Sequence, residues 1–272
     1  MARRPASGRR PLVDGAHYPS GAPVDGPMLA MAPDGRRMVR ADASRETLWA
    51  LDLDEGSAVS LQRQSAEHRS PLVVAEISRD GSRIAFALED RSIVVFDADS
   101  GGVVRVVATG FEGAISSLTI SADARLIAAG SEDKSVRVWD VVSGRTLGVP
   151  LTGPAGTVSH LAFGPDGRRL AAGEGKSVWI WDVESARPIG GPLQGHDWDI
   201  TSVVFGADGH RVISYSGDSV AVWDADTARQ VAQASRGAVV RPIRDQPERE
   251  VLRRRGGARS AAIRRADRRA DR

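Results

Sequence analysis

Residues 196 to 223 hold three side-chain types that together could form a hydrolytic site. His196, Ser214 and Asp218 would supply a base, a nucleophile and an orienting carboxylate, and Trp223 follows five residues later. A catalytic serine normally sits on a strained turn that exposes its hydroxyl, and Ser214 lacks that context. A buried indole also needs a hydrogen-bond acceptor. We therefore favour a structural role for these four residues over a hydrolase site.

Other patterns that could carry chemistry are weaker. Gly175-Lys176-Ser177 matches only the end of a phosphate-binding loop, because Leu170 stands where that loop requires a glycine. The chain has no cysteine, which excludes a disulfide and a thiolate zinc site. The remaining histidines show no metal-ligand spacing: His17, His68, His160 and His210. We expect no cofactor and no metal.

The elements that must position these residues recur along the chain. A turn aspartate returns at spacings of 46, 43, 43 and 42 residues, at Asp34, Asp80, Asp123, Asp166 and Asp208. Each repeat then closes on an apolar or aromatic residue and a second aspartate, as in Leu51-Asp52, Phe96-Asp97, Trp139-Asp140, Trp181-Asp182 and Trp223-Asp224. The second aspartates could suggest a carboxylate ring for a metal, but their place directly after a strand favours capping of backbone N–H groups. A fixed period of this size indicates a repeat architecture.

Each repeat is expected to form four short strands. In the fourth repeat, the alternation predicts strands at 158–163, 168–172 and 177–182, and a further strand near 188–189. Such a sheet has two apolar faces that it cannot bury alone, so successive sheets must stack around an axis. The pattern predicts the blades of an all-β propeller.

The repeats resemble the WD-repeat β-propeller family, in the form of bacterial WD repeat domain-containing proteins. The resemblance rests on the Trp-Asp pairs and on Gly195-His196, and it covers roughly residues 28 to 233. In that family a loop histidine, a strand hydroxyl, a turn aspartate and the indole N–H form a hydrogen-bond network inside the blade. The resemblance assigns these places to His196, Ser214, Asp218 and Trp223. Earlier repeats lack the set, with Phe111 or Pro154 for the histidine and Ala129 or Ala172 for the hydroxyl.

We divide the chain into three parts. Residues 1–27 are expected to be mostly disordered, with a candidate ring-closing strand near residues 10–13. Residues 28–235 form the propeller, with about five blades at 28–71, 72–114, 115–157, 158–199 and 200–235. Residues 236–272 form a basic, disordered tail. Five blades lie within the known range, and an incomplete ring is the alternative.

The net charge of +2 conceals an asymmetry. Residues 1–10 carry +4 and residues 236–272 carry +8, which leaves −10 on the rest of the chain. An acidic body with arginine-rich ends differs from a uniformly basic protein. No apolar run has the length of a membrane span, and we expect a soluble, cytoplasmic protein.

A loop tryptophan is the candidate partner-contact residue. Trp198 lies between Asp197 and Asp199 in a loop expected to open on one face of the ring, and Glu132 and Glu174 lie on turns expected at that face. Exposed aromatic residues often dominate the energetics of interfaces. The opposing interpretation is that Trp198 folds back over its blade.

The function indicated by the resemblance is a non-catalytic scaffold that binds proteins or peptides through the loops between blades. Two alternatives stay open. One is an enzyme with a site in the central channel, which would need clustered histidines or carboxylates from several blades. The other is nonspecific binding of nucleic acid or an anionic surface through the arginine-rich ends.

Overall fold

The computed structural model of the protein describes residues 26–41, 47–61, 70–217, 219–235 and 241–242. In these ranges the chain is all-β, without helices, and its strands form five separate antiparallel sheets. The first sheet contains β1 (Met28–Met31), β2 (Arg37–Ala41), β3 (Leu48–Asp52) and β4 (Ser57–Leu61). The second contains β5 (Leu72–Ile77), β6 (Arg83–Leu88), β7 (Ser92–Asp97) and β8 (Val103–Ala108).

The next sheets have irregular outer strands. The third contains β9 (Ile115–Ile120), β10 (Leu126–Ser131) and β11 (Val136–Asp140), and two isolated bridges, Val136 to Leu151 and Trp139 to Thr146, attach its outer segment. The fourth contains β12 (Val158–Phe163), β13 (Arg169–Glu174), β14 (Ser177–Asp182), β15 (Arg187–Pro188) and β16 (Leu193–Gln194). Both β15 and β16 pair with β14, so the outer strand of this sheet is interrupted.

The fifth sheet is the last one along the chain. It contains β17 (Ser202–Phe205), β18 (Arg211–Ser216), β19 (Ser219–Asp224), β20 (Arg229–Ser235) and β21 (Arg241–Pro242). We call the five sheets blades 1 to 5 in chain order. The four-stranded antiparallel order predicted for each repeat is confirmed, with an irregular fourth strand in blades 3 and 4 and an added short strand in blade 5.

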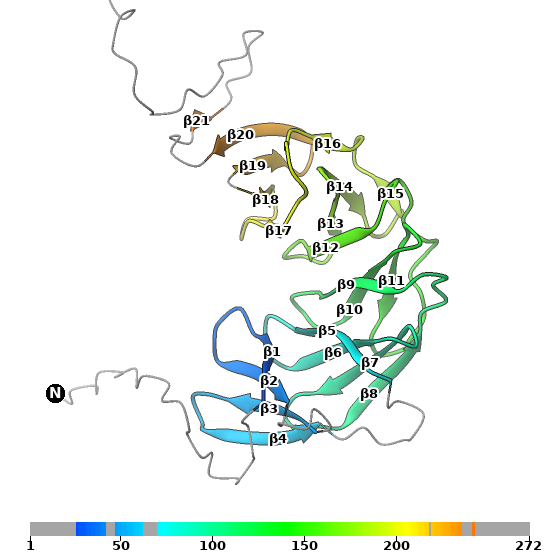
Figure 1. The fold of residues 1–272 in the computed structure, drawn as a ribbon, viewed down its shortest axis with the longest axis vertical. Helices are drawn as coiled ribbons and strands as arrows, with labels where there is room; N and C mark the ends of the chain where they lie inside the picture. The colour runs from blue at the N-terminus through cyan, green and yellow to red at the C-terminus, as the bar shows by residue number, and fades with distance from the viewer. Residues whose placement is uncertain (1–25, 42–46, 62–69, 218, 236–240, 243–272) are drawn as a thin grey trace, which may run out of the picture.

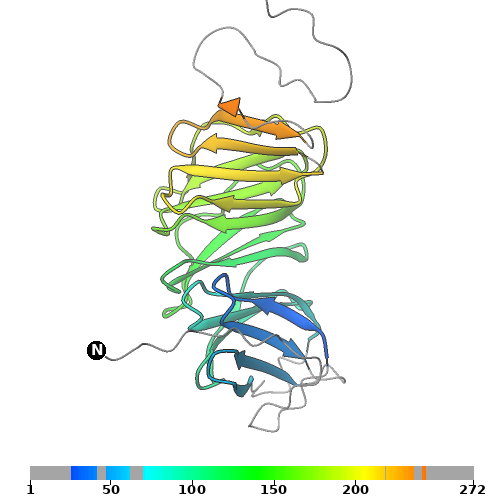
Figure 2. The same cartoon turned by 90° about the vertical axis from the view of Figure 1, so that its left-hand side faces the viewer.

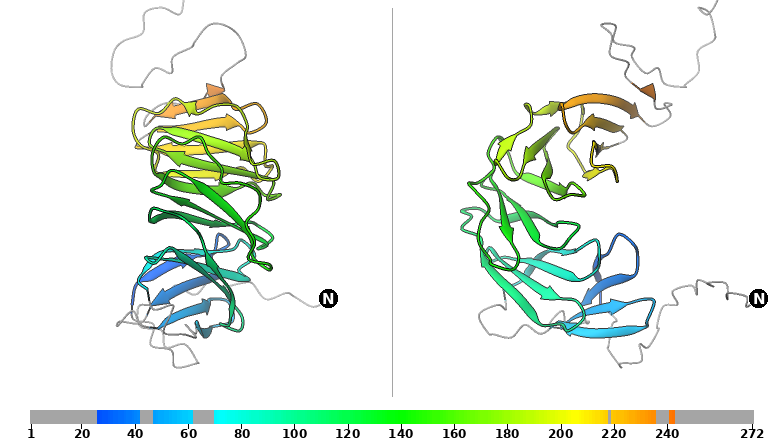
Figure 3. Two further views of the ribbon diagram at one scale, coloured as in Figure 1. Left: turned by 90° about the vertical axis from the view of Figure 1, so that its right-hand side faces the viewer. Right: turned by 180° about the vertical axis from the view of Figure 1, so that it is seen from behind.

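The blades stand side by side along an open arc. Figure 1 shows blade 1 at one end of the arc and blade 5 at the other, with the first strands β1, β5, β9, β12 and β17 on the concave side. Figure 2 shows the sheets stacked face against face. Seen from behind in Figure 3, blades 1 and 5 are separated by the opening of the arc. The propeller architecture is therefore confirmed, in the form of an incomplete ring.

The core consists of four apolar clusters, one at each junction between neighbouring blades. The residue before four of the strand-end aspartates lies in this core: Phe96, Trp139, Trp181 and Trp223 are at most 2% exposed. Leu51 of blade 1 is also buried but lies outside these four clusters. Burying a side chain of phenylalanine size is worth roughly 2–3 kcal/mol. The apolar half of each Trp-Asp pair thus stabilises a junction.

Both kinds of repeated aspartate organise turns. The Oδ1 of each turn aspartate accepts a hydrogen bond from the backbone N–H two residues later, as Asp166 does from Arg168 at 3.0 Å. The Oδ1 of each strand-end aspartate accepts from backbone N–H groups, as Asp182 does from Ser185 at 2.8 Å. Capping of the strand ends, predicted from the sequence, is confirmed.

Several expectations fall outside the described residues. These include the strand near residues 10–13, residues 1–25 as a whole, and residues 243–272 of the basic tail. Within the predicted tail, Arg241 and Pro242 form β21, and Arg241 pairs with Gln233 of β20. No helix in the part of the chain that the structure describes is long and apolar enough to cross a membrane.

Candidate functional site

The structure brings together three of the four residues singled out in the fifth repeat. His196 begins the loop before β17, Ser214 lies on β18 and Trp223 on β19. The Trp223 indole N–H donates to Ser214 Oγ at 2.8 Å, and His196 Nε2 lies 2.6 Å from the same oxygen. Asp218 lies outside the described residues. The hydroxyl of Ser214 therefore links the loop to two neighbouring strands.

The hydrogen bonds determine the state of the histidine. Ser219 Oγ donates to the carbonyl oxygen of Ser216 at 3.0 Å, so it accepts from His196 Nδ1, 3.0 Å away. His196 Nε2 then accepts the Ser214 hydroxyl proton, which identifies the neutral imidazole with Nδ1–H. Burial lowers the pKa of His196, and nearby Asp197 partly offsets this effect. The network is complete only while His196 is uncharged.

This geometry does not suit a nucleophilic serine. Ser214 is fully buried in a regular strand, and its oxygen already accepts the indole proton. The second nitrogen of His196 faces the hydroxyl of Ser219, where a catalytic triad would place a carboxylate. The described residues also contain no group of three or more potential metal ligands. The arrangement stabilises the blade.

In blades 3 and 4 the buried tryptophan makes other contacts than Trp223 makes in blade 5. In blade 3, Phe111 packs edge-on against Trp139 with ring centroids 5.9 Å apart, much as His196 lies 6.2 Å from Trp223. In blade 4 the Trp181 indole N–H donates to the backbone carbonyl of Thr152 at 3.2 Å. The buried tryptophan is common to these blades, whereas its acceptor and its ring partner vary.

Trp198 lies on what we call the loop face, formed by the loops between blades and the turns between second and third strands. Its side chain is 68% exposed. Its carbonyl oxygen accepts a hydrogen bond from Ser216 Oγ at 2.5 Å, and a Cβ atom added to Gly217 would lie 3.5 Å from Trp198 Cδ1. The indole thus rests against the β18–β19 turn with most of its surface in solvent.

The acidic residues expected around Trp198 are spread along the arc from the Trp198 loop to blades 4 and 3. Asp197 and Asp199 are exposed beside it, and the backbone N–H of Ile200 donates to the Gly175 carbonyl at 2.7 Å. This bond places the Trp198 loop next to Glu174. Glu174 Oε2 accepts the Trp179 indole N–H at 3.2 Å, so this carboxylate also has a structural role. Glu132 is exposed one blade further along.

The loop face is acidic. Its described residues include three cations, Arg91, Lys134 and Lys176, and none of its acids forms an ion pair with another described residue. Eight carboxylates lie among the described residues of this face: Glu89, Asp90, Glu112, Glu132, Asp133, Glu174, Asp197 and Asp199. A ligand that approaches this face meets a net negative potential, because its described carboxylates outnumber its described cations.

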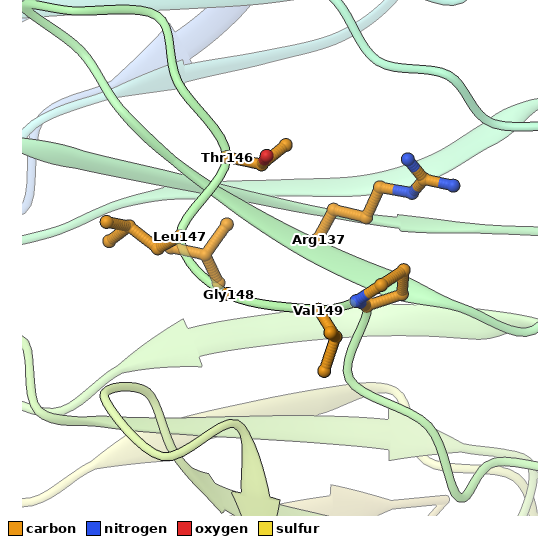
Figure 4. A pocket seen from close by; sticks show the side chains of 7 residues that line it. Arg137, Thr146, Leu147, Gly148 and Val149 are labelled. Carbon is orange, nitrogen blue, oxygen red and sulfur yellow. The ribbon is translucent and has the colours of Figure 1, made fainter.

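A small hollow at the rim of blade 3 is a poor candidate for a ligand site. It lies between β11 and the irregular segment after it, and Figure 4 shows Arg137, Thr146, Leu147, Gly148 and Val149 around it. Its volume of about 50 Å³ is far below the roughly 300–1,000 Å³ of small-molecule pockets.

Sequence reasoning missed some members of these sites. Ser219 completes the His196 network, and Trp179 engages Glu174. A serine after the β18–β19 turn gave only a weak signal, because many serines occupy such turns. Trp179 follows Glu174 by five residues across a turn, and this spacing could have indicated the contact.

The repeats match a known family model. The model described as WD domain, G-beta repeat, matches residues 103–140, 144–182 and 188–224. Each matched stretch ends at a Trp-Asp pair, and the second and third begin near the outer strand of the preceding blade. Residues 103–224 therefore contain three WD repeats, and repeats of this family generally mediate contacts between proteins. A search among curated proteins finds no match to the chain.

Proposed function

We propose that the protein is a non-catalytic scaffold that binds a protein or peptide partner on its loop face, with Trp198 as the central contact. The observation that carries this proposal is the exposure of Trp198 on a loop held by hydrogen bonds at both ends. His196 anchors its start through Ser214, and Ile200 anchors its end through Gly175. A large exposed aromatic on a fixed backbone loses little conformational entropy on binding.

The surrounding charge indicates the chemistry of the partner. Asp197 and Asp199 flank the indole, and Glu132 lies further along the same face. A partner with arginine or lysine side chains would be steered toward this surface, and arginine can also stack on the indole. A cytoplasmic location is part of the proposal, and fractionation of the source cell tests it.

The proposal is tested by quantitative capture of partners from the source cell with wild-type chain and with Trp198→Ala. We expect the variant to lose most of the captured partner at an unchanged melting temperature, because the side chain contributes little to the core. Val142→Ala is the control, since Val142 is a similarly exposed apolar residue (69%) that lies on blade 3 in the turn after β11, away from the loop face. Equal capture by wild type and Trp198→Ala would rule out this site.

A further inference from the structure

Each blade has a trailing face that packs against the blade that follows it. The second strand contributes two small or medium-sized side chains to that face. In blades 1 to 4 both positions are buried, and the pairs are Val39 and Ala41, Ala85 and Ala87, Ala128 and Gly130, and Ala171 and Gly173. The second position of each pair is alanine or glycine.

Small residues are required at the second position because the following blade packs closely against it. A Cβ atom added to Gly130 would lie 2.8 Å from Val158 Cβ, and one added to Gly173 would lie 2.8 Å from Ile200 Cγ2. Val158 and Ile200 belong to the following blades. A large side chain at this position would therefore keep the next blade from packing as it does at the existing junctions.

Blade 5 departs from this pattern. Ile213 and Tyr215 occupy the two positions, in the register that Ala171 and Gly173 have in blade 4, because they pair with Val222 and Val220 of β19. Tyr215 is 41% exposed and Val204 is 39% exposed. No further sheet lies beyond this face in the described part of the chain (Figure 1). The face is apolar but too bulky for a standard sixth blade.

The arginine on this face lacks the contacts to a following blade that two earlier arginines make, and like Arg83 of blade 2 it pairs within its own blade. Arg37 of blade 1 and Arg169 of blade 4 cross their junctions to the next blade, where they meet the carbonyl oxygens of Gly81 and Gly209 and the carboxylates of Asp99 and Asp226. Arg211 holds the equivalent place in blade 5. Among the described residues its ion-pair partner is Asp224 of its own blade, at 3.5 Å, the longest such distance in the structure.

We propose that the trailing face of blade 5 is a two-fold interface with a second copy of this chain. A two-fold contact needs a self-complementary patch. The centre of this patch is uncharged and consists of Ile213, Tyr215, Val220 and Val222. Arg211 and Asp224 lie at one end of it, so each copy presents one positive and one negative charge to the other. The protruding side chains suit two sheets about 10 Å apart, the spacing of a sandwich.

The size of the patch sets the strength of this dimer. Four strands about 4.8 Å apart, with about 3.3 Å per residue, give a patch of roughly 400 Å² on each copy. Stable interfaces bury about 800 Å² on each partner. The dimer is therefore weak and forms in the micromolar to millimolar range of protein concentration.

Sedimentation equilibrium of the full chain across that range tests the proposal. We expect the average mass to rise with concentration from 28.9 kDa toward twice that value and no further. The same rise is expected at high salt. Tyr215→Lys should raise the dissociation constant at least tenfold without lowering the melting temperature. Val142→Lys, at an exposed position on blade 3, should leave it unchanged.

Three results would overturn the proposal. The wild-type chain could remain monomeric throughout the range, its dimer could be insensitive to Tyr215→Lys, or its mass could grow beyond two copies. The last result would indicate a head-to-tail contact between different faces.

Discussion

The two ends of the stacked blades use their charged residues in opposite ways. Opposite the loop face lies the turn face, formed by the turns between first and second strands and between third and fourth strands. All seven ion pairs of the described residues lie there, together with the turn and strand-end aspartates that recur in each repeat. The acids of the loop face form none with described residues. Charge at the turn face serves folding. On the loop face Asp90 and Asp133 also cap turns, whereas Asp197 and Asp199 accept no hydrogen bond from a described residue and are available to a partner.

The hydrogen bonds beneath the loop face should give the largest effect on stability. Ser214→Ala leaves the buried indole N–H of Trp223 and the ring of His196 without their common partner, at a cost of about 3 kcal/mol. Because His196 begins the Trp198 loop, partner capture should weaken as well. Urea denaturation measures the loss. Ser202→Ala in the same blade should change stability by less than about 0.5 kcal/mol, and equal losses would contradict the proposed role of the network.

A carboxyl group that lies on neither the loop face nor the turn face provides a reference for both. Glu76 lies on β5, which packs against β9, and burial raises its pKa to about 7. The folded state therefore holds this proton more tightly than the unfolded state, whose pKa is 4.5. The stabilising effect is fully present below pH 4.5 and is lost as the pH rises through about 7.

Glu76→Gln should remove that dependence on pH. At pH 8 the variant should be more stable than wild type by roughly 3 kcal/mol, from about 1.4 kcal/mol per pKa unit. Near pH 4.5 the two should unfold alike. Thermal unfolding across pH 4 to 8 measures the difference, and parallel curves for the two proteins would show that Glu76 is not buried as described.

The turn face should be sensitive to loss of a single carboxylate. Asp182→Ala removes the hydrogen bonds that Ser185 makes through its N–H and hydroxyl, and we expect a loss of about 2 kcal/mol. These bonds lower the pKa of Asp182 below its ordinary value. Its contribution is therefore present above pH 3.8 and is lost as the pH falls through the folded pKa.

The matched change on the loop face should have the smallest effect. Asp197→Ala removes an exposed acid that forms no ion pair with a described residue, so stability should change by less than about 0.5 kcal/mol. Denaturation of the two alanine variants side by side measures the contrast. If Asp197→Ala costs as much as Asp182→Ala, the distinction between the two faces is wrong.

Much of this structure could be predicted from the sequence, because the repeat is local. The period and the capping aspartates depend on residues within one blade, and the recurring Trp-Asp pairs mark Trp139, Trp181 and Trp223 as core residues. The burial of Glu76 could not be predicted, because it depends on the approach of the next blade. The need for small residues opposite Val158 and Ile200 could not be predicted either, because it arises from the close packing of neighbouring blades. The exposure of Trp198 likewise depends on how its loop rests on Gly217.

The central claim is that the loop face binds the partner. The most direct test is hydrogen–deuterium exchange of the full chain with and without the captured partner. We predict that protection on binding will concentrate in residues 195–201 and 174–176, with little change at the turns around Asp80, Asp123 and Asp166. Protection confined to those turns, with the Trp198 loop unchanged, would contradict the account.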